Sequence, residues 1–197
     1  MKILIATKNK GKMAELQSLL AGENFQFVSL DAFENVPDVE ETGSTFAENA
    51  RLKAVEYSRL FALHTIADDS GLEVEALDGR PGVLSARYGG VKSDYGTKIR
   101  SLLDEIDSSK IPGRKARFVA HIAFASPEGD VLFEAEGICP GTVAFKTKGM
   151  NGFGYDPIFI PDGFDQTFGE LSDEVKQNIS HRARATLKII RYLRDLA

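Results

Sequence analysis

The sequence predicts an α/β fold around a mixed sheet, and two observations lead to this prediction. In residues 2–107, short apolar runs alternate with segments of helical periodicity, an order typical of parallel strands joined by helices. Residues 115–146 instead contain consecutive strand patterns around a tight turn, which is typical of antiparallel pairing. With 197 residues, 43% of them hydrophobic, the chain is expected to form a single domain over 1–197, as one unit or two closely packed lobes.

The first elements predicted are a strand, a loop, a helix and a second strand. The run KILIA (2–6) precedes the polar loop TKNKGK (7–12), and MAELQSLLA (13–21) follows with apolar residues at helical spacing. FQFVSL (25–30) reads as the next strand, and an acidic loop follows it. Strand and helix therefore alternate from the N-terminus.

The middle of the chain predicts two helices separated by a strand. Thr45 and Glu48 have the spacing of a capping box, which predicts a helix over 45–61. TIADDSG predicts a strand over 65–69 that ends in a Ser-Gly turn, with a Gly/Pro-rich loop after it. YGTKIRSLLDEID (95–107) carries its Ile and Leu residues on one side, as an amphipathic helix does.

The last part of the chain predicts a hairpin and a helical end. The hairpin turns at Pro127–Asp130, and one more strand follows it up to residue 146. GMNGFGYDPIF (149–159) is a loop punctuated by glycines, and residues 171–196 are helical. The helix can restart at Ser180, because serine is a favourable N-cap residue.

Composition argues against several classes of protein. A net charge of −5 is unfavourable for a broad nucleic-acid interface, although a local basic pocket for one small anion is compatible with it. Cys139 is the single cysteine, so the chain forms no intramolecular disulfide, which favours a reducing compartment. The opening apolar run is too short for a signal peptide, and FVAHIAFA is too short to span a membrane. We therefore expect a cytoplasmic protein whose partners include neither nucleic acid nor a membrane.

The loop after the first strand is similar to a phosphate-binding loop but departs from it at two positions. Ala6 stands where a P-loop has its first glycine, and Met13 stands where it has the metal-binding Ser or Thr. The loop still precedes a helix N-terminus, where free N–H groups and the helix dipole favour an anion. A solvated basic turn without a ligand is the alternative. The candidate residues are Thr7, Lys8, Asn9, Lys10, Gly11 and Lys12.

Two adjacent acids, Asp68 and Asp69, end the strand predicted over 65–69. Neighbouring side chains of a strand point to opposite faces, so the two cannot both line one cleft. Ligands of α/β proteins bind at the carboxyl ends of strands, which favours Asp69 as a metal ligand or as a base for water. Asp68 is then expected to bind backbone, and a simple Asx turn before Ser70 is the alternative.

The acidic loop before the helix at 45–61 offers a second carboxylate. Mg²⁺ takes one or two protein carboxylates together with phosphate oxygens and water, and Glu40 or Glu41 with Asp69 would meet that count. Periodicity does not choose between the two glutamates. Acids that merely suit a helix N-terminus are the alternative.

Two further segments carry groups that suit a purine nucleotide. In NGFGYDP, a ring flanked by glycines can lie on a base while a carboxylate or amide reads its edge, although a tight turn with a core aromatic is the plainer reading. In KQNISHRAR, the donors near a helix start suit a purine carbonyl or a phosphate, and an arginine-rich surface helix is the alternative. The candidates are Phe153, Gly154, Tyr155, Asp156, Lys176, His181 and Arg182.

Taken together, six motifs resemble the Ham1-like family of inosine/xanthosine triphosphate pyrophosphatases in order and spacing. They are TKNKGK, EETGSTFAENA, ADDSGL, PGVLSARY, GFGYDPIF and SHRARA, and they run almost from end to end. The resemblance implies an ITPase-like (Maf/Ham1) fold with a mixed twisted sheet, flanking helices and two lobes around a central cleft. It also implies a homodimer, one or more Mg²⁺ ions per active site, and hydrolysis of non-standard purine nucleotides (dITP/ITP, XTP/dXTP) to the monophosphate and pyrophosphate, which cleanses the nucleotide pool.

Carried onto this sequence, the resemblance gives each motif a role. Residues 7–12 would bind the triphosphate, with Lys8 where many members carry glycine. Asp69 would be the metal-linked proton acceptor, beside Glu40 or Glu41. The remaining residues in the family's pattern would contact the substrate (Ser70, Phe153, Gly154, Tyr155, Asp156, Lys176, His181 and Arg182) or support the site (Asn49, Lys53 and Asp68).

Selectivity is expected at the edge of the base. Hypoxanthine and xanthine carry a 6-carbonyl acceptor where adenine carries an amino donor, so donors near the base would reject ATP. Rejection of GTP requires that the 2-amino group of guanine be excluded or left unpaired. Two other classes stay open: a Maf-like pyrophosphatase acting on pyrimidine or methylated nucleotides, and a nucleotide-binding module without catalysis.

Overall fold

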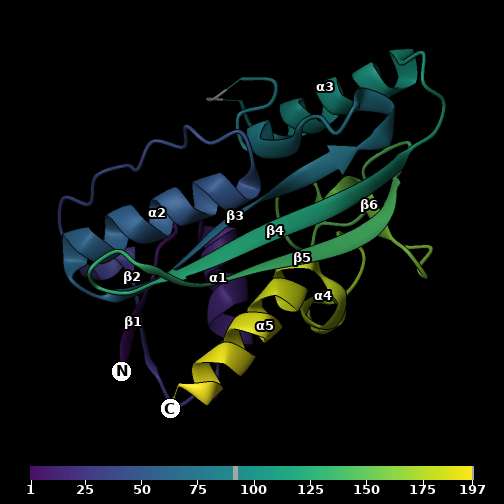
Figure 1. Ribbon diagram of the computed structural model, residues 1–197. Helices are drawn as coiled ribbons and strands as arrows, with labels where there is room; N and C mark the ends of the chain where they lie inside the picture. The colour runs from purple at the N-terminus through teal and green to yellow at the C-terminus, as the bar shows by residue number, and fades with distance from the viewer. Residues whose placement is uncertain (91–92, 197) are drawn as a thin grey trace. The chain divides into compact units, whose positions relative to one another are not determined.

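The structure is a computed structural model that describes residues 1–90 and 93–196. Its strands are β1 (Lys2–Ile5), β2 (Gln26–Ser29), β3 (His64–Val74), β4 (Lys115–Ala125), β5 (Val131–Val143) and β6 (Phe159–Pro161). In the described ranges they form one sheet with the order β2-β1-β3-β4-β5-β6 (Figure 1). β1 pairs in parallel with β2 and β3, whereas β5 pairs antiparallel with β6, so the predicted mixed sheet is confirmed.

The helices begin close to the residues that the sequence predicts. They are α1 (Lys10–Leu19), α2 (Phe46–Phe61), α3 (Tyr95–Ser108), α4 (Asp173–Ile179) and α5 (His181–Asp195). Both halves of the capping box between Thr45 and Glu48 are present, so the predicted start of α2 is confirmed. Ser180 separates α4 from α5, as its N-cap preference indicates. Among the helices of the described ranges, none combines the length and apolar character needed to cross a membrane.

The chain divides into two compact units. Unit 1 consists of Met1–Asp69, Ala120–Gly137 and Arg182–Ala197, and unit 2 consists of Ser70–Val119 and Ile138–His181. Each unit has its own buried apolar core, as the clusters of packed residues show.

Unit 1 places helices against both faces of its part of the sheet. Side chains of β1 alternate between the faces: Ile3 and Ile5 join one core cluster, whereas Leu4 joins the other. The first cluster packs against α1 and α5, and the second packs against α2 through Ala50 and Ala54 (Figure 1). These two layers hold α1, α2 and β3 in fixed positions, and the candidate residues of unit 1 lie on these elements and the loops that precede them.

The core of unit 2 is built from the second parts of β3 and β5, from the first part of β4 and from α3. Leu72 of β3 and Leu102 of α3 are both fully buried in it. Aromatic rings fill the remainder: the centroid of Phe159 lies 4.6 Å from that of Phe118 and 5.5 Å from that of Phe168. This aromatic core supports the loop between β5 and β6.

Three strand predictions were wrong. β3 does not end in a turn at the Ser-Gly pair but continues to Val74, so Asp69 lies inside a strand rather than at its end. Gly71 is suited to this strand because a Cβ there would collide with the Ser85 hydroxyl. The hairpin turn was placed correctly, but β5 is one continuous strand, and β6 was not expected.

Candidate active site

Asp69 is the centre of a polar cluster inside unit 1. Its side chain is buried on β3, and one carboxylate oxygen accepts a hydrogen bond from the amide of Asn49 on α2 at 3.2 Å. The other oxygen accepts from the Lys53 ammonium, also at 3.2 Å, and lies 3.9 Å from the Lys12 ammonium. Asp69 therefore accepts two hydrogen bonds from α2, where Lys53 is one turn after Asn49 on the same face, and it forms an ion pair with Lys12 of α1.

Lys53 joins Asp69 to the acidic loop before α2. The same ammonium donates to Glu41 at 2.6 Å, so two carboxylates converge on one cation. The Asn49 side chain also accepts from the backbone N–H of Gly43 at 2.8 Å, which fixes this loop. Of the two candidate glutamates, Glu41 is thus brought to Asp69 through Lys53, whereas Glu40 is exposed.

A second network surrounds Asp68. One of its carboxylate oxygens lies 2.7 Å from the Lys12 ammonium, and the other lies 3.3 Å from the Arg182 guanidinium, which also forms an ion pair with Glu15. Asp68 and Arg182 are each 1% exposed. Asp68 forms ion pairs with both cations, and Lys12 is long enough to reach both adjacent acids although they point to opposite faces of the strand.

The two acids differ in their affinity for a proton. Burial raises the pKa of Asp69, and the nearby negative charge of Glu41 raises it further against the opposing effect of Lys53. Burial acts in the same direction on Asp68, but the charges of Arg182 and then Lys12 outweigh it and hold the pKa of Asp68 below its ordinary range. Asp68 therefore loses its proton more readily than Asp69, and Asp69 is the better proton acceptor of the two.

The predicted phosphate loop leads into the N-terminus of α1. Asn9 caps the helix by accepting from the N–H of Lys12 at 3.1 Å, and Thr7 accepts from the N–H of Asn9 at 3.2 Å. Lys8 is turned to an exposed ion pair with Asp38 at 2.6 Å. Lys12 thus lies in the cluster around the two acids, while Lys8 and Lys10 are exposed.

The candidate residues of the glycine loop lie together in unit 2. The Asp156 carboxylate accepts from the N–H of Phe153 at 2.7 Å and forms an ion pair with Lys176 of α4. The Lys176 ammonium also lies 4.8 Å from the centroid of the Phe153 ring, a cation–π contact. Gly152 and Gly154 have positive φ angles, which this tight loop requires.

The other candidates of unit 2 differ in exposure. Ser70 and Phe153 are half-buried, whereas Tyr155 and Asp156 are buried. His181 is also buried and its ring stacks on Phe118 at a centroid distance of 4.7 Å. Phe153 is therefore the more exposed of the two aromatic residues of this loop.

Sequence reasoning missed three residues of these networks. Glu15 lies three positions after Lys12 on α1, and this spacing places both side chains on one face of the helix. The spacing could therefore have indicated that Glu15 belongs to the same network as Lys12. In unit 2, the Ser85 carbonyl accepts from Tyr155 of the glycine loop, and Lys98 donates to the carbonyl of Ala86, the residue after Ser85. Ser85 belongs to PGVLSARY, a motif that had been quoted without a role.

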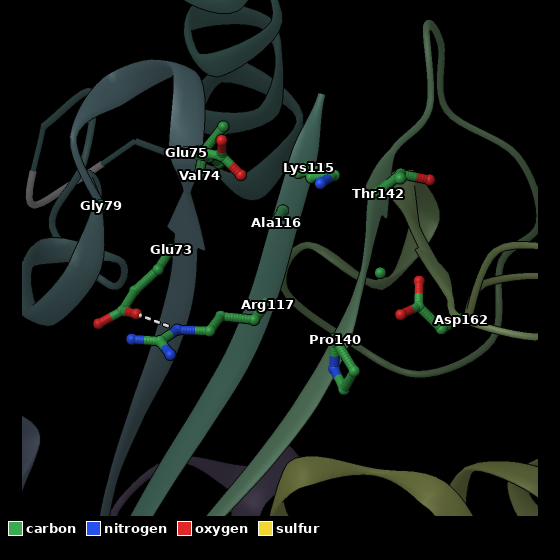
Figure 2. A pocket seen from close by; sticks show the side chains of 11 residues that line it. Glu73, Val74, Glu75, Gly79, Lys115, Ala116, Arg117, Pro140, Thr142 and Asp162 are labelled. Carbon is green, nitrogen blue, oxygen red and sulfur yellow. Dashed lines mark hydrogen bonds and ion pairs between the residues drawn. The ribbon is translucent and has the colours of Figure 1, made fainter. Parts of the chain in front are cut away.

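A separate cavity of 560 Å³ lies on unit 2 (Figure 2). Its walls carry charges of both signs from β3 and β4, and Glu73 forms an ion pair with Arg117 at 2.6 Å across them. None of the predicted site residues lines it among the residues that the structure describes. Because none of the candidate residues lines it, the cavity is not assigned to the nucleotide.

The chain is similar to known proteins over its whole length. A dITP/XTP pyrophosphatase from Oceanobacillus iheyensis is 45% identical over 196 residues, which cover 99% of either chain. Another dITP/XTP pyrophosphatase, from Halalkalibacterium halodurans, is 43% identical and covers 96% of this chain and 97% of the relative.

Solved structures and a family model agree with this likeness. The structure of a HAM1 protein from Coxiella burnetii superposes with a TM-score of 0.91 at 37% identity over 99% of both chains. A nucleoside-triphosphatase described as a dITP/XTP pyrophosphatase, from Mycobacterium abscessus, gives a TM-score of 0.77 at 42% identity over 96% of this chain and 98% of the other. The model of the Ham1 family matches residues 3–192. Because the family model covers nearly the whole chain and these relatives are similar to it from end to end, the chain belongs to the Ham1 family.

Proposed function

We propose that this protein hydrolyses non-standard purine nucleoside triphosphates, dITP/ITP and XTP/dXTP, to the monophosphate and pyrophosphate. The names of its relatives support this substrate class. The observation that carries the proposal is the convergence of Glu41 and Asp69 on the ammonium of Lys53, 2.6 and 3.2 Å away, beside a helix N-terminus suited to phosphate. Removal of such nucleotides would keep them out of DNA and RNA, a task for a cytoplasmic enzyme.

The carboxylates fit a magnesium ion. The Lys53 ammonium forms ion pairs with both Glu41 and Asp69, which supports a cation position beside them, and Mg²⁺ usually takes one or two protein carboxylates with substrate oxygens and water. We therefore assign Glu41 and Asp69 as the residues that would hold it, and the exposed Glu40 would not. When bound, the ion would neutralise negative charge on the phosphates.

The protein's own residues supply the remaining chemistry. Asp69, whose pKa is raised by burial, would accept the proton of the attacking water. The oxygen of that water forms a bond to phosphorus, and the bond between the α- and β-phosphates breaks, so that pyrophosphate leaves. Lys12 would stabilise the charge that develops, because its ammonium lies 3.9 Å from Asp69. The segment from Thr7 to Lys12 would hold the other phosphate oxygens at the start of α1, where the helix dipole favours an anion.

Residues of unit 2 would recognise the base. Phe153 would contact the flat face of the purine, while Lys176 and His181 would donate to its 6-carbonyl. Arg182 belongs to unit 1, and because its guanidinium forms ion pairs with Asp68 and Glu15, it would act on the substrate through these two acids. Adenine offers an amino group at the same position, so these donors would reject ATP.

The first test is pyrophosphate release from dITP, XTP, GTP, ATP and TTP, each with Mg²⁺ and with chelator. Release from dITP and XTP that requires Mg²⁺, with weak turnover of GTP and ATP, is expected. Preference for TTP would favour a Maf-like activity, and binding without turnover would favour a non-catalytic module. We also propose that the protein is a homodimer, which light scattering after gel filtration would test.

A further inference from the structure

We propose that Ser85 and Tyr155 form a positioning pair that sets the selectivity of the enzyme for the purine base. The Tyr155 hydroxyl donates to the backbone carbonyl of Ser85 at 3.0 Å. This bond would fix the loop at 152–156, so the inference rests on the base-binding role proposed for that loop. Neither residue needs to touch the reacting phosphates.

Ser85 is a junction between segments of unit 2. Its hydroxyl accepts from the N–H of Leu72 on β3 at 3.0 Å and donates to the carbonyl of Gly82 at 2.6 Å. A Cβ at Gly71 would collide with this hydroxyl, so the serine lies directly against the strand backbone. The next peptide is held as well, because the buried Lys98 ammonium donates to the carbonyl of Ala86 at 2.6 Å. The acceptor offered to Tyr155 is therefore fixed on both sides.

Tyr155 is placed to position the loop rather than to bind the base. It is 3% exposed, and its ring forms a T-shaped pair with the neighbouring Tyr95 ring at a centroid distance of 5.6 Å. Tyr95 in turn lies under the Lys98 ammonium, 4.9 Å from its centroid. Burial and then Tyr95 raise the pKa of Tyr155, so it stays a neutral donor at every physiological pH.

The loop would transmit a shift of Tyr155 to the residues on either side. Phe153 donates its N–H to the carboxylate of Asp156 at 2.7 Å, so the two residues that flank Gly154 and Tyr155 in this turn are tied together. A Cβ at Gly152 would collide with the same carboxylate, which shows how closely the turn is folded. Lys176 contacts both the carboxylate and the Phe153 ring. Loosening Tyr155 would therefore displace the ring and the ammonium assigned to the base.

The consequence is a selectivity effect rather than a general loss of activity. Hypoxanthine and guanine share the 6-carbonyl and differ in the 2-amino group, so their discrimination depends on how closely the base is held. Loss of the Tyr155 bond should reduce the ratio of kcat/KM for dITP to that for dGTP by about threefold to tenfold, as expected for one hydrogen bond. The kcat for dITP should change less than its KM, because the phosphate chemistry is assigned to unit 1.

The test compares Tyr155→Phe with a matched control, Tyr57→Phe. Tyr57 is also buried, and its hydroxyl also donates to a backbone carbonyl at 3.0 Å, that of Pro37 in unit 1. The two variants should lose similar stability, but only Tyr155→Phe should lower the dITP to dGTP ratio at saturating Mg²⁺. An unchanged dITP to dGTP ratio in Tyr155→Phe, or an equal fall of this ratio in Tyr57→Phe, would contradict the positioning role proposed for Ser85 and Tyr155.

Two further variants separate this inference from the proposed function. Ser85→Ala removes the bonds to β3 and Gly82 and should lower the ratio in the same direction as Tyr155→Phe. Phe153→Leu should raise the KM for dITP if the loop binds the base. If Phe153→Leu raises the KM for dITP while neither Tyr155→Phe nor Ser85→Ala changes the dITP to dGTP ratio, the positioning role of Ser85 and Tyr155 is wrong. The base-binding role of the loop is then still supported. If Phe153→Leu changes nothing, the base site and the pair both fail.

Discussion

Lys12 lies between the two adjacent acids of β3, with its ammonium 2.7 Å from Asp68 and 3.9 Å from Asp69. One lysine of the phosphate loop is therefore held at the proton acceptor, while Lys8 forms an exposed pair with Asp38. The three lysines of this loop should accordingly differ in role. Lys12 is placed to stabilise the transition state, and the exposed lysines are placed to attract the triphosphate.

Substitution of these lysines should separate kcat from KM. Lys12→Met should lower kcat for dITP by about 100-fold or more, because a preorganised positive charge at the reacting group is removed. Lys10→Met should mainly raise KM, since Lys10 is exposed and would contribute to binding in the ground state and the transition state alike. Steady-state kinetics of pyrophosphate release measure both. A larger kcat effect from Lys10→Met than from Lys12→Met would contradict the assignment.

Asp68 should be essential for stability. Asp68→Asn removes the anion that both Lys12 and Arg182 bind in a fully buried site, and breaking such a buried pair typically costs about 3–5 kcal/mol. Asp38→Asn is the control, because its pair with Lys8 is exposed and such pairs contribute about 0–1 kcal/mol. Urea unfolding followed by circular dichroism measures the difference. Equal free energies of unfolding for the two variants would show that the Asp68 network is not a stabilising one.

The two glutamates of the acidic loop should differ in their effect on the metal requirement. Glu41→Gln should raise the Mg²⁺ concentration for half-maximal activity at least about tenfold, because one of the two carboxylates assigned to the ion is lost. Glu40→Gln is an isosteric control that changes the charge by the same amount at an exposed residue. Its Mg²⁺ concentration for half-maximal activity should stay near that of the wild type. Activity measured against Mg²⁺ concentration decides between the residues. The reverse order would assign the metal to Glu40.

Alkaline pH should destabilise the protein partly through Tyr155. Burial and then Tyr95 raise its pKa above the ordinary tyrosine value of about 10. Its contribution to stability is therefore complete below the pKa of the unfolded chain and is lost as the pH rises through the folded pKa. The free energy of unfolding should fall more steeply above about pH 10 in the wild type than in Tyr155→Phe. Identical slopes in urea titrations of both proteins would contradict this role.

The sequence predicts those features that depend on neighbouring residues in the chain. The start of α2 follows from a local capping box, and the break at Ser180 follows from a favourable N-cap residue. The extension of β3 past Gly71 could not be predicted, because the glycine is needed only against Ser85, which is distant in sequence. Its Ser-Gly pair has the composition of a turn, and tertiary packing overrides that local signal.

The same distinction holds for the candidate site. Asp69 could be selected as a candidate because an apolar run precedes it and Ser-Gly follows it. The argument placed it at the end of a strand, but β3 continues to Val74. The choice of Glu41 over Glu40 required the contact from Lys53, which depends on the path of a loop without periodicity. The ion pair between Arg182 and Glu15 joins residues 167 positions apart, and no spacing rule predicts it.

The central claim is that the cluster around Asp69 is the catalytic centre for hydrolysis of non-standard purine nucleotides. The most direct measurement is pyrophosphate release from dITP by Asp69→Asn with saturating Mg²⁺, alongside the wild type and with the fold of both checked by circular dichroism. Loss of the proton acceptor should lower kcat by about 100-fold to 10,000-fold while the variant stays folded. A folded Asp69→Asn protein that retains more than about a tenth of the wild-type kcat would contradict the account, because the water would then be activated by another group.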